Sequence, residues 1–356
     1  MATVKLEDVI DVEIYSGIEP ENNPEQTIWF ESGVAIRTAE LDMKARAESD
    51  TTNMPFWRDL DPTDEPDYLS NGDDRSTPRK VVQGVMQGKR AHLGKSWAAR
   101  DLTSEFTMGV DPMTRIRNRT GKYWMWQWQR RAIACLEGVY NANVAGNIDQ
   151  GFGSPGDMIL DISSPNIAGV NPTTEFNYEA FVDARFTMGE RVEELNTMLV
   201  HPTIHARLLK NNDIEFIIHP KDNNKTIQMY AGHRVVVSDN APVVANGDGS
   251  FRYLTCIFGP AAIGYGMGMH DTPFELYRDP SIGNGSGETL LFERNTWLIH
   301  FFGHSNMNAV NSGGQANGSG AATGFLSQTL ADCRLPENWR RNYFRQNVPI
   351  AFLRSN

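Results

Sequence analysis

The chain has 356 residues, of which 40% are hydrophobic, which is enough apolar material for a core and excludes a chain disordered throughout. No apolar run reaches the eighteen or so residues that a membrane-spanning helix needs, and the N-terminus lacks a basic segment followed by an apolar one. The three cysteines have no CxxC spacing. We therefore expect a soluble protein with no membrane partner, made in a reducing cytoplasm.

The net charge of −11 is unevenly distributed. Residues 1–74 hold 5 Lys/Arg against 19 Asp/Glu, whereas residues 75–131 hold 13 against 3. Each block alone is typical of a solvated face. Two adjacent blocks of opposite sign favour pairing, either within one subunit or between neighbours.

The first hundred residues have weak local signals. Residues 1–49 alternate between apolar and polar around two prolines, which predicts an extended arm with one or two short strands. Residues 50–78 are rich in proline and acids and predict an excursion from the fold. From Arg79 onward, Gly84, Gly88 and Gly94 interrupt the pattern, which predicts strand pairs joined by glycine turns that return to the body near Asp101.

The strongest local signal predicts one long helix over 111–147. Asp111 is a good N-cap, Pro112 suits the first helical position, and Gly146 with Asn147 supplies a stop. At about 1.5 Å per residue this helix spans roughly 50 Å, more than the width of an ordinary compact domain. Its midsection, GKYWMWQWQRR, mixes cations and aromatic rings, which would suit single-stranded nucleic acid but better suits a helix packed inside an acidic protein.

Residues 155–270 predict a mixed α and β lobe. A helix over 177–192 begins at Asn177, a buried strand covers 197–200, and a proline-started helix follows His201. Five β-rich segments complete the lobe. Two strands within 273–303 are expected to pair across a glycine turn, a small-residue tract over 311–324 to be flexible, and Val348 to Leu353 to form a last strand.

Candidate chemistry is sparse. His201 and His205 have the spacing of two metal ligands on a helix, but Pro202 stands where an HExxH site needs Glu. The glycine-rich stretch after Gly259 lacks the GK[ST] ending of a phosphate loop, and no convincing nucleophile has a histidine partner. We therefore predict no enzyme activity, catalytic residue, metal or cofactor.

The order of these elements resembles the major capsid proteins of tailed bacteriophages, which have the Hong Kong 97-type α+β fold. The resemblance also rests on MYAGHRVVVSDNAPV, YLTCIFGPAAIGYG, FELYRDPSIGNGSGETLLFERNTWLIHFFGHS and ENWRRNYFRQNVPI. It implies seven parts: an N-arm (1–49), an E-loop (50–105), a peripheral P domain (106–154) whose spine helix is 111–147, an A domain (155–270), returning P-domain strands (271–310), a flexible loop (311–324) and a C-terminal segment (325–356).

The resemblance implies a structural protein of the virion capsid. Copies would form hexamers and pentamers of an icosahedral shell around double-stranded DNA, with portal and scaffold or decoration proteins as further partners. We predict that contacts between copies use nine charged residues and one tryptophan of the two charge blocks: Arg79, Lys80, Lys89, Arg90, Trp57, Asp59, Asp61, Asp64, Glu65 and Asp67.

Three alternatives stay open at this point. Encapsulins, which are cellular compartments that hold enzymes, share the same fold. A cytosolic enzyme or a single-strand nucleic-acid-binding protein is the alternative of a different class. One type of family member also joins its copies by covalent Lys–Asn bonds, so the resemblance leaves crosslinking through Lys80, Lys89 or Lys95 open.

Overall fold

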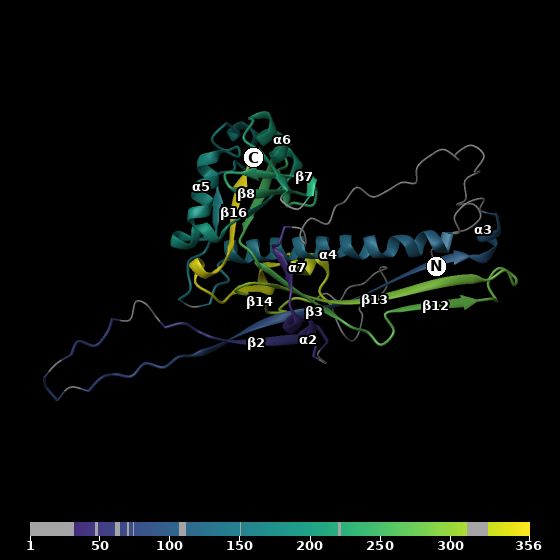
Figure 1. Ribbon diagram of the computed structural model, residues 1–356, viewed down its shortest axis with the longest axis horizontal. Coiled ribbons are helices and arrows are strands. Elements are labelled where there is room, and N and C mark those ends of the chain that lie inside the picture. The colour runs from purple at the N-terminus through teal and green to yellow at the C-terminus, as the bar shows by residue number, and fades with distance from the viewer. Residues whose placement is uncertain are drawn as a thin grey trace.

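The computed structural model describes residues 32–46, 49–60, 65–69, 71–73, 75–106, 112–149, 151–219, 222–311 and 327–356. Most of the expected N-arm, the cap Asp111 and nearly all of the small-residue tract lie outside these ranges. The described residues form two large β-sheets, a long helix and a thin projection (Figure 1). No helix among them is both long and apolar enough to cross a bilayer.

The long helix is α4, Pro112–Ala145, which confirms the predicted rod to within two residues at either end. It ends at Gly146, whose φ of +75° stops the helical path. From Trp128 onward most side chains are buried in the main core, whereas the first half rests with one side on a sheet. The helix therefore joins the central core to an extended wing of the molecule (Figure 1).

The first sheet has the strand order β1-β11-β13-β3-β2, and β12 also pairs with β13. Its members are β1 (Ala35–Arg37), β2 (Thr51–Trp57), β3 (Gln83–Arg100), β11 (Ile263–Gly268), β12 (Phe274–Asp279) and β13 (Glu288–Phe301). The antiparallel pair β12–β13 confirms the hairpin predicted for 273–303. A short helix, α3 (Asp101–Phe106), follows β3.

The glycine turns predicted after Arg79 are wrong. Gly84, Gly88 and Gly94 all lie inside the single 18-residue strand β3. A Cβ added at Gly84 would lie 2.5 Å from the Phe56 ring on β2, so this glycine makes room for an aromatic ring across the strand pair. A turn glycine and a close-packing glycine look alike in sequence, because the packing partner lies elsewhere in the chain.

The predicted extended arm with short strands over 1–49 is also incomplete, because α2 (Ala39–Arg46) is a helix. Its buried Leu41 and Ala45 lie on β11. A Cβ at Gly266 would lie 2.2 Å from the carbonyl oxygen of Leu41, so the helix backbone rests directly on the strand. The alternating glycines of β11 create the seat for α2.

We expect Gly266→Ala to destabilise the fold by about 1–3 kcal/mol, because the methyl group meets backbone atoms of α2 that cannot rotate away. The midpoint of urea unfolding measures this change. Gly121→Ala in α4 is the matched control: its Cβ meets nothing within 4 Å, and alanine favours a helix. Equal unfolding midpoints for Gly266→Ala and Gly121→Ala would contradict the close packing of α2 on β11.

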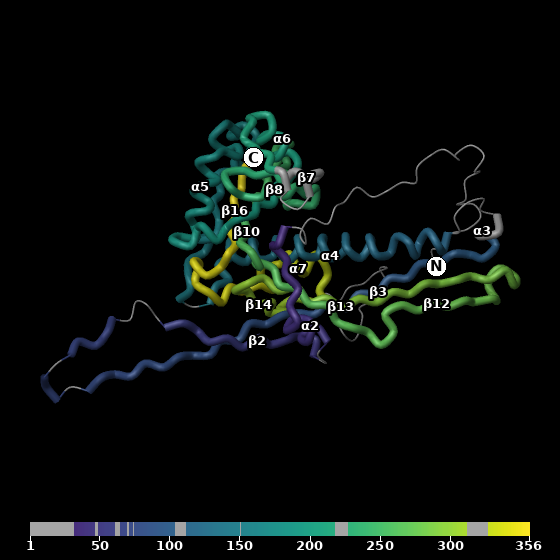
Figure 2. Tube along the Cα trace, viewed as in Figure 1, coloured from purple at the N-terminus to yellow at the C-terminus, as the bar shows by residue number. Residues whose placement is uncertain are grey.

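The second sheet has the order β4-β16-β10-β5-β8-β7-β6, with β9 beside β10. Its strands are β4 (Ile159–Asp161), β5 (Thr197–Val200), β6 (Glu215–His219), β7 (Asp222–Tyr230), β8 (His233–Val237), β9 (Val243–Ala245), β10 (Phe251–Phe258) and β16 (Ile350–Ser355). Figure 2 shows the last strand, β16, beside β10 in the interior of this lobe. The predicted strand at 348–353 is therefore confirmed.

Two helices of this lobe confirm the predicted caps. α5 (Tyr178–Phe186) begins after Asn177, whose Oδ1 accepts a hydrogen bond of 2.8 Å from the Ala180 N–H. α6 (Pro202–Lys210) begins after His201, whose Nδ1 accepts from the Thr203 N–H. The strand β11, by contrast, pairs in the first sheet. By its sheet pairing, this lobe therefore comprises the chain up to about Phe258 together with the last strand, β16.

Candidate intersubunit contact surfaces

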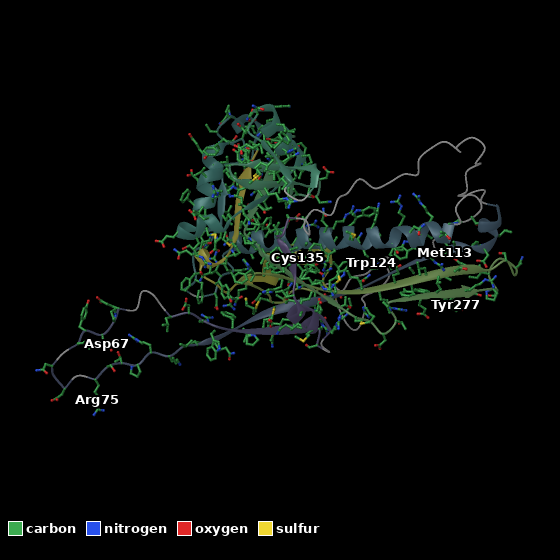
Figure 3. All side chains as sticks on the ribbon, viewed as in Figure 1. Asp67, Arg75, Met113, Trp124, Cys135 and Tyr277 are labelled. Carbon is green, nitrogen blue, oxygen red and sulfur yellow. The ribbon has the colours of Figure 1, made fainter. Side chains whose placement is uncertain are left out.

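The most conspicuous feature is the projection formed by residues 58–82, beyond the paired strands β2 and β3. Figure 3 shows Asp67 and Arg75 at its far end, remote from both sheets. The Arg58 N–H donates to the Val82 carbonyl, and the Thr77 N–H donates to Asp67, so the two arms run side by side. We call residues 58–82 the excursion.

Apolar side chains at the tip of the excursion are exposed. Tyr68 is 82% exposed and Leu69 is fully exposed, between prolines and acids. Large apolar side chains in such a position commonly mark a contact with another chain. Sequence reasoning singled out the charges here and missed Leu69, although its apolar type in a polar stretch was visible.

Three segments meet at the base of the excursion. The carboxylate of Asp149, which follows α4, accepts 2.6 Å hydrogen bonds from Arg58 and from Arg340 of β15 (Trp339–Arg341). The Arg58 guanidinium also lies 4.6 Å from the centre of the Phe152 ring. Asp149 therefore fixes the direction in which the excursion leaves the body. The sequence carries no local signal for this cluster.

A cleft of about 690 Å³ opens beside this base. Its walls include Phe56 and Trp57 from β2, Phe302 after β13, and Tyr343 and Phe344 after β15. The Phe56 and Tyr343 rings meet edge to face at 4.9 Å, whereas Trp57 stays 68% exposed. Charged groups of the second lobe, such as Arg191 and Glu194, pair with each other at the rim.

Of the ten predicted contact residues, six are exposed, two are buried and two lie outside the described residues. Trp57, Asp59, Glu65, Asp67, Arg79 and Lys80 are all exposed along the excursion or at its base. Within the tip, Glu65 accepts a hydrogen bond from the Tyr68 hydroxyl. Asp61 and Asp64 lie outside the described residues.

Lys89 and Arg90, by contrast, lie inside the subunit, each only 5% exposed. The Lys89 ammonium pairs with Asp50, and Arg90 donates to the carbonyl of Ala45 at the end of α2. Burial lowers the pKa of Arg90. These two cations serve the packing of β3, and their burial does not fit the predicted contact between copies.

The aromatic midsection of α4 packs within the subunit. The Trp124 indole N–H donates to Glu293 of β13, and its ring meets Trp297 edge to face at 5.7 Å. Tyr123 meets Trp97 at 5.4 Å and Trp128 meets Tyr265 at 5.3 Å. Tyr123, Trp124 and Trp128 are therefore engaged by the first sheet and are not available for stacking on bases.

The histidine pair of α6 has ordinary structural roles. His201 caps the helix, and His205 Nε2 lies 2.6 Å from the side-chain oxygen of Gln228. Across the described part of the chain, no group of three or more His, Cys, Asp or Glu side chains could hold a metal ion.

Comparison with known proteins gives the family. No protein-family model matches the chain. The chain is 30% identical over 304 residues to the major capsid protein of Bacillus phage SPP1, covering 84% of this chain and 86% of that protein.

Two solved capsids have a similar fold at low identity. The capsid of the cyanophage P-SCSP1u has a TM-score of 0.53 at 14% identity, covering 81% of this chain and 89% of that one. The capsid of Ralstonia phage GP4 has a TM-score of 0.51 at 11% identity, covering 95% of both chains. The chain thus belongs to the family of tailed-phage major capsid proteins and has their Hong Kong 97-type α+β fold.

Proposed function

We propose that the chain self-assembles through hexamers and pentamers into the icosahedral shell that encloses the double-stranded DNA of a phage. The relationship to a major capsid protein over most of both chains carries this proposal. The excursion supports it, because Tyr68 and Leu69, which follow Asp67 at the tip, are exposed. Both the encapsulin alternative and the enzyme or nucleic-acid-binding alternative are less favoured by these relatives.

Electron microscopy of the expressed protein tests the proposal. We expect closed shells or capsomer-sized rings, alone or after addition of a scaffold protein from the same phage. A protein that stays monomeric under all of these conditions would contradict it. Portal and scaffold or decoration proteins are proposed partners, and the proposed location is the virion, after synthesis in the host cytoplasm.

The sheet pairing supports a revised proposal for the parts of the subunit. The E-loop comprises β2, the excursion and the start of β3, within the predicted 50–105. The A domain comprises about 155–258 together with β16, since β11 pairs in the first sheet. The P domain then contains α4, the rest of β3, and the hairpin strands β12 and β13.

We further propose that the charges of the excursion contact neighbouring copies. Since Lys89 and Arg90 are buried, the proposal now rests on Arg79 and Lys80 as cations, and on Asp59, Glu65 and Asp67 as acids. Asp61 and Asp64 remain proposed members of the acidic group.

Replacing both exposed cations, Arg79→Gln/Lys80→Gln, should raise the concentration needed for assembly severalfold. The effect should be largest at low salt, because salt screens exposed charges. Light scattering against protein concentration at two ionic strengths measures it. Lys210→Gln, an exposed charge on α6, is the control and should assemble normally. Assembly of the double variant at the wild-type concentration in low salt would refute the contact.

A further inference from the structure

Two of the three cysteines meet in the main core, although they lie far apart in the sequence. Cys135 belongs to α4, and Cys333 is the last residue of α7 (Leu330–Cys333), a short helix that follows the small-residue tract. Both residues are buried, at 4% and 1% exposure. The Cys135 thiol donates a hydrogen bond to the Cys333 sulfur. The fold therefore brings together two thiols that no CxxC spacing connects.

The backbones at this point pack as closely as the two thiols. A Cβ added at Gly138 would lie 2.0 Å from the carbonyl oxygen of Cys333, so a glycine lets α7 approach α4. Gly138 lies three residues after Cys135, on the same face of the helix. The indole N–H of Trp339 donates to the same carbonyl at 2.8 Å. The Cys333 backbone is thus fixed against the face of α4 that carries Cys135.

Further hydrogen bonds hold both ends of α7. Its N-cap Thr329 and Asp332 exchange reciprocal bonds in a capping box. Beyond its last turn, the Asn141 side chain of α4 donates to the Arg334 carbonyl at 2.9 Å. Figure 3 shows Cys135 on the part of α4 that lies in the body of the subunit. Two groups held in this way lose little freedom when a covalent bond forms between them.

The two thiols differ in acidity. The hydrogen bond from Cys135, helped by the positive charges of Arg131 and Arg334, lowers the pKa of Cys333 to about 7 in spite of its burial. The same hydrogen bond and burial raise the pKa of Cys135 well above its ordinary value. The thiolate is the form of cysteine that attacks an oxidant, and a neighbouring thiol then resolves the product. Cys333 therefore suits the attacking role and Cys135 the resolving role.

The third cysteine provides a contrast within the same chain. Buried cysteines commonly do no more than fill space in a core. Cys256 of β10 fits that description, because it is fully buried and burial is the main cause of its raised pKa. No thiol contributes to that shift, whereas Cys135 and Cys333 are each the largest influence on the pKa of the other. Cys256 is therefore an internal control for the pair.

We propose that Cys135 and Cys333 form a redox modification site, at which hydrogen peroxide converts the two thiols into a disulfide within one chain. The Cys333 thiolate attacks a peroxide oxygen: an S–O bond forms, the O–O bond breaks, and hydroxide leaves and takes up a proton as water. Cys135 then attacks the resulting sulfenic acid: the S–S bond forms, the S–O bond breaks, and the second water leaves with the Cys135 proton. Both sulfurs are oxidised and both peroxide oxygens are reduced.

The disulfide would join α4 to the last part of the chain. The loop that it closes contains most of the second lobe and the hairpin β12–β13. A disulfide that closes a long loop stabilises more than one that closes a short loop, because it removes more freedom from the unfolded chain. Hydrogen peroxide is little larger than water, so it can reach a site that excludes bulky reagents. The site lies within one subunit, so the inference does not depend on the proposed function.

Counting thiols on the folded, full-length chain tests the proposal. The reduced chain is treated with hydrogen peroxide in native buffer, the peroxide is removed, and the chain is unfolded in N-ethylmaleimide and weighed. The untreated chain should take up three maleimides, one for each cysteine, and the treated chain only one, on Cys256. Treated Cys256→Ala should take up none. Treated Cys333→Ala, which lacks the attacking thiol, should keep two.

Three outcomes of this count would overturn the inference. The treated wild type could still take up three maleimides. Peptide mapping could place Cys256 in the disulfide, or could find the bond between two chains. The bond could also form only after the chain has been unfolded in urea before the peroxide is added, which would show that the folded core does not bring the two sulfurs together.

Urea unfolding shows whether the bond fits the native packing. The midpoint of the oxidised wild type should exceed that of the reduced wild type by about 1 M, and Cys256→Ala should show the same difference. Cys333→Ala should show none. An oxidised wild type that unfolds at the same or a lower urea concentration would overturn the inference. If Cys333→Ala does not fold, the wild type and Cys256→Ala still decide the question.

Discussion

Lowering the pH from about 6.5 to 4 is expected to destabilise the subunit by several kcal/mol, because two buried histidines resist protonation in the folded chain but take up protons when it unfolds. Burial lowers the pKa of His300 to about 4 and that of His304 to about 3, from an ordinary value of 6.5. His304 also lies near Arg341 and Arg345, whose positive charges oppose a further one. Its Nδ1 lies 3.1 Å from the carbonyl oxygen of Phe302.

The direction of the effect follows from proton binding. Below pH 6.5 the unfolded chain binds these protons and the folded chain does not, so acid favours unfolding. The full stability is present above pH 6.5 and is lost as the pH falls toward the pKa values of His300 and His304 in the folded chain. At 1.36 kcal/mol per unit of pKa, each histidine contributes about 3 kcal/mol at pH 4.

Urea unfolding midpoints at a series of pH values between 7 and 4 measure this loss. His300→Gln and His304→Gln should each flatten the pH dependence, whatever they cost at pH 7. His205→Gln, on the partly exposed side of α6, is the control and should leave the slope unchanged. If both buried-site variants kept the wild-type slope, the acid sensitivity would have another origin.

Elements with local signals could be predicted from the sequence. Pro112 and Gly146 bracket α4, Asn177 caps α5, and the glycine turn after β12 joins a hairpin. Each signal lies within a few residues of the boundary it sets. The helix α2 escaped prediction because its eight residues are too few for a clear period and because its seat consists of glycines in β11, over two hundred residues away.

The contact surfaces were less predictable, for the same reason. Whether Lys89 is exposed depends on its pairing register with Thr51, which brings Asp50 to its ammonium group. The Asp149 cluster needs Arg58 and Arg340, which lie in distant parts of the chain. Composition alone located the basic and acidic blocks, but the fold decides which charges reach the surface.

The second large effect is expected for Asp157→Ala, which should destabilise the fold by about 3–5 kcal/mol. The Arg341 side chain is only 2% exposed and donates to both oxygens of Asp157 at 2.6 Å. It also donates to the Phe152 carbonyl at 2.9 Å. Removing the carboxylate leaves a buried guanidinium without a countercharge, which costs far more than the loss of a surface pair.

The control is Asp161→Ala, which removes the same group from a looser pair. Asp161 lies 3.6 Å from Arg354 and its side chain is 41% exposed, so its removal should cost less than about 1 kcal/mol. The double variant Asp157→Leu/Arg341→Met should be more stable than Asp157→Ala, because it leaves no buried charge. Equal urea midpoints for the Asp157→Ala and Asp161→Ala variants would contradict this reasoning.

The pair also connects the core to the contact surface. Burial disfavours ionisation of Asp157, but hydrogen bonds from Arg341 and Asn143 outweigh it and hold the pKa below 3.8, so the pair is lost only as the pH falls below that value. Arg341 precedes the cleft residue Tyr343 and follows Arg340, which holds Asp149. Asp157→Ala should therefore also loosen the base of the excursion. Faster proteolysis within 58–82 than in the Asp161→Ala control, at a temperature where both chains remain folded, would show that the two sites are coupled.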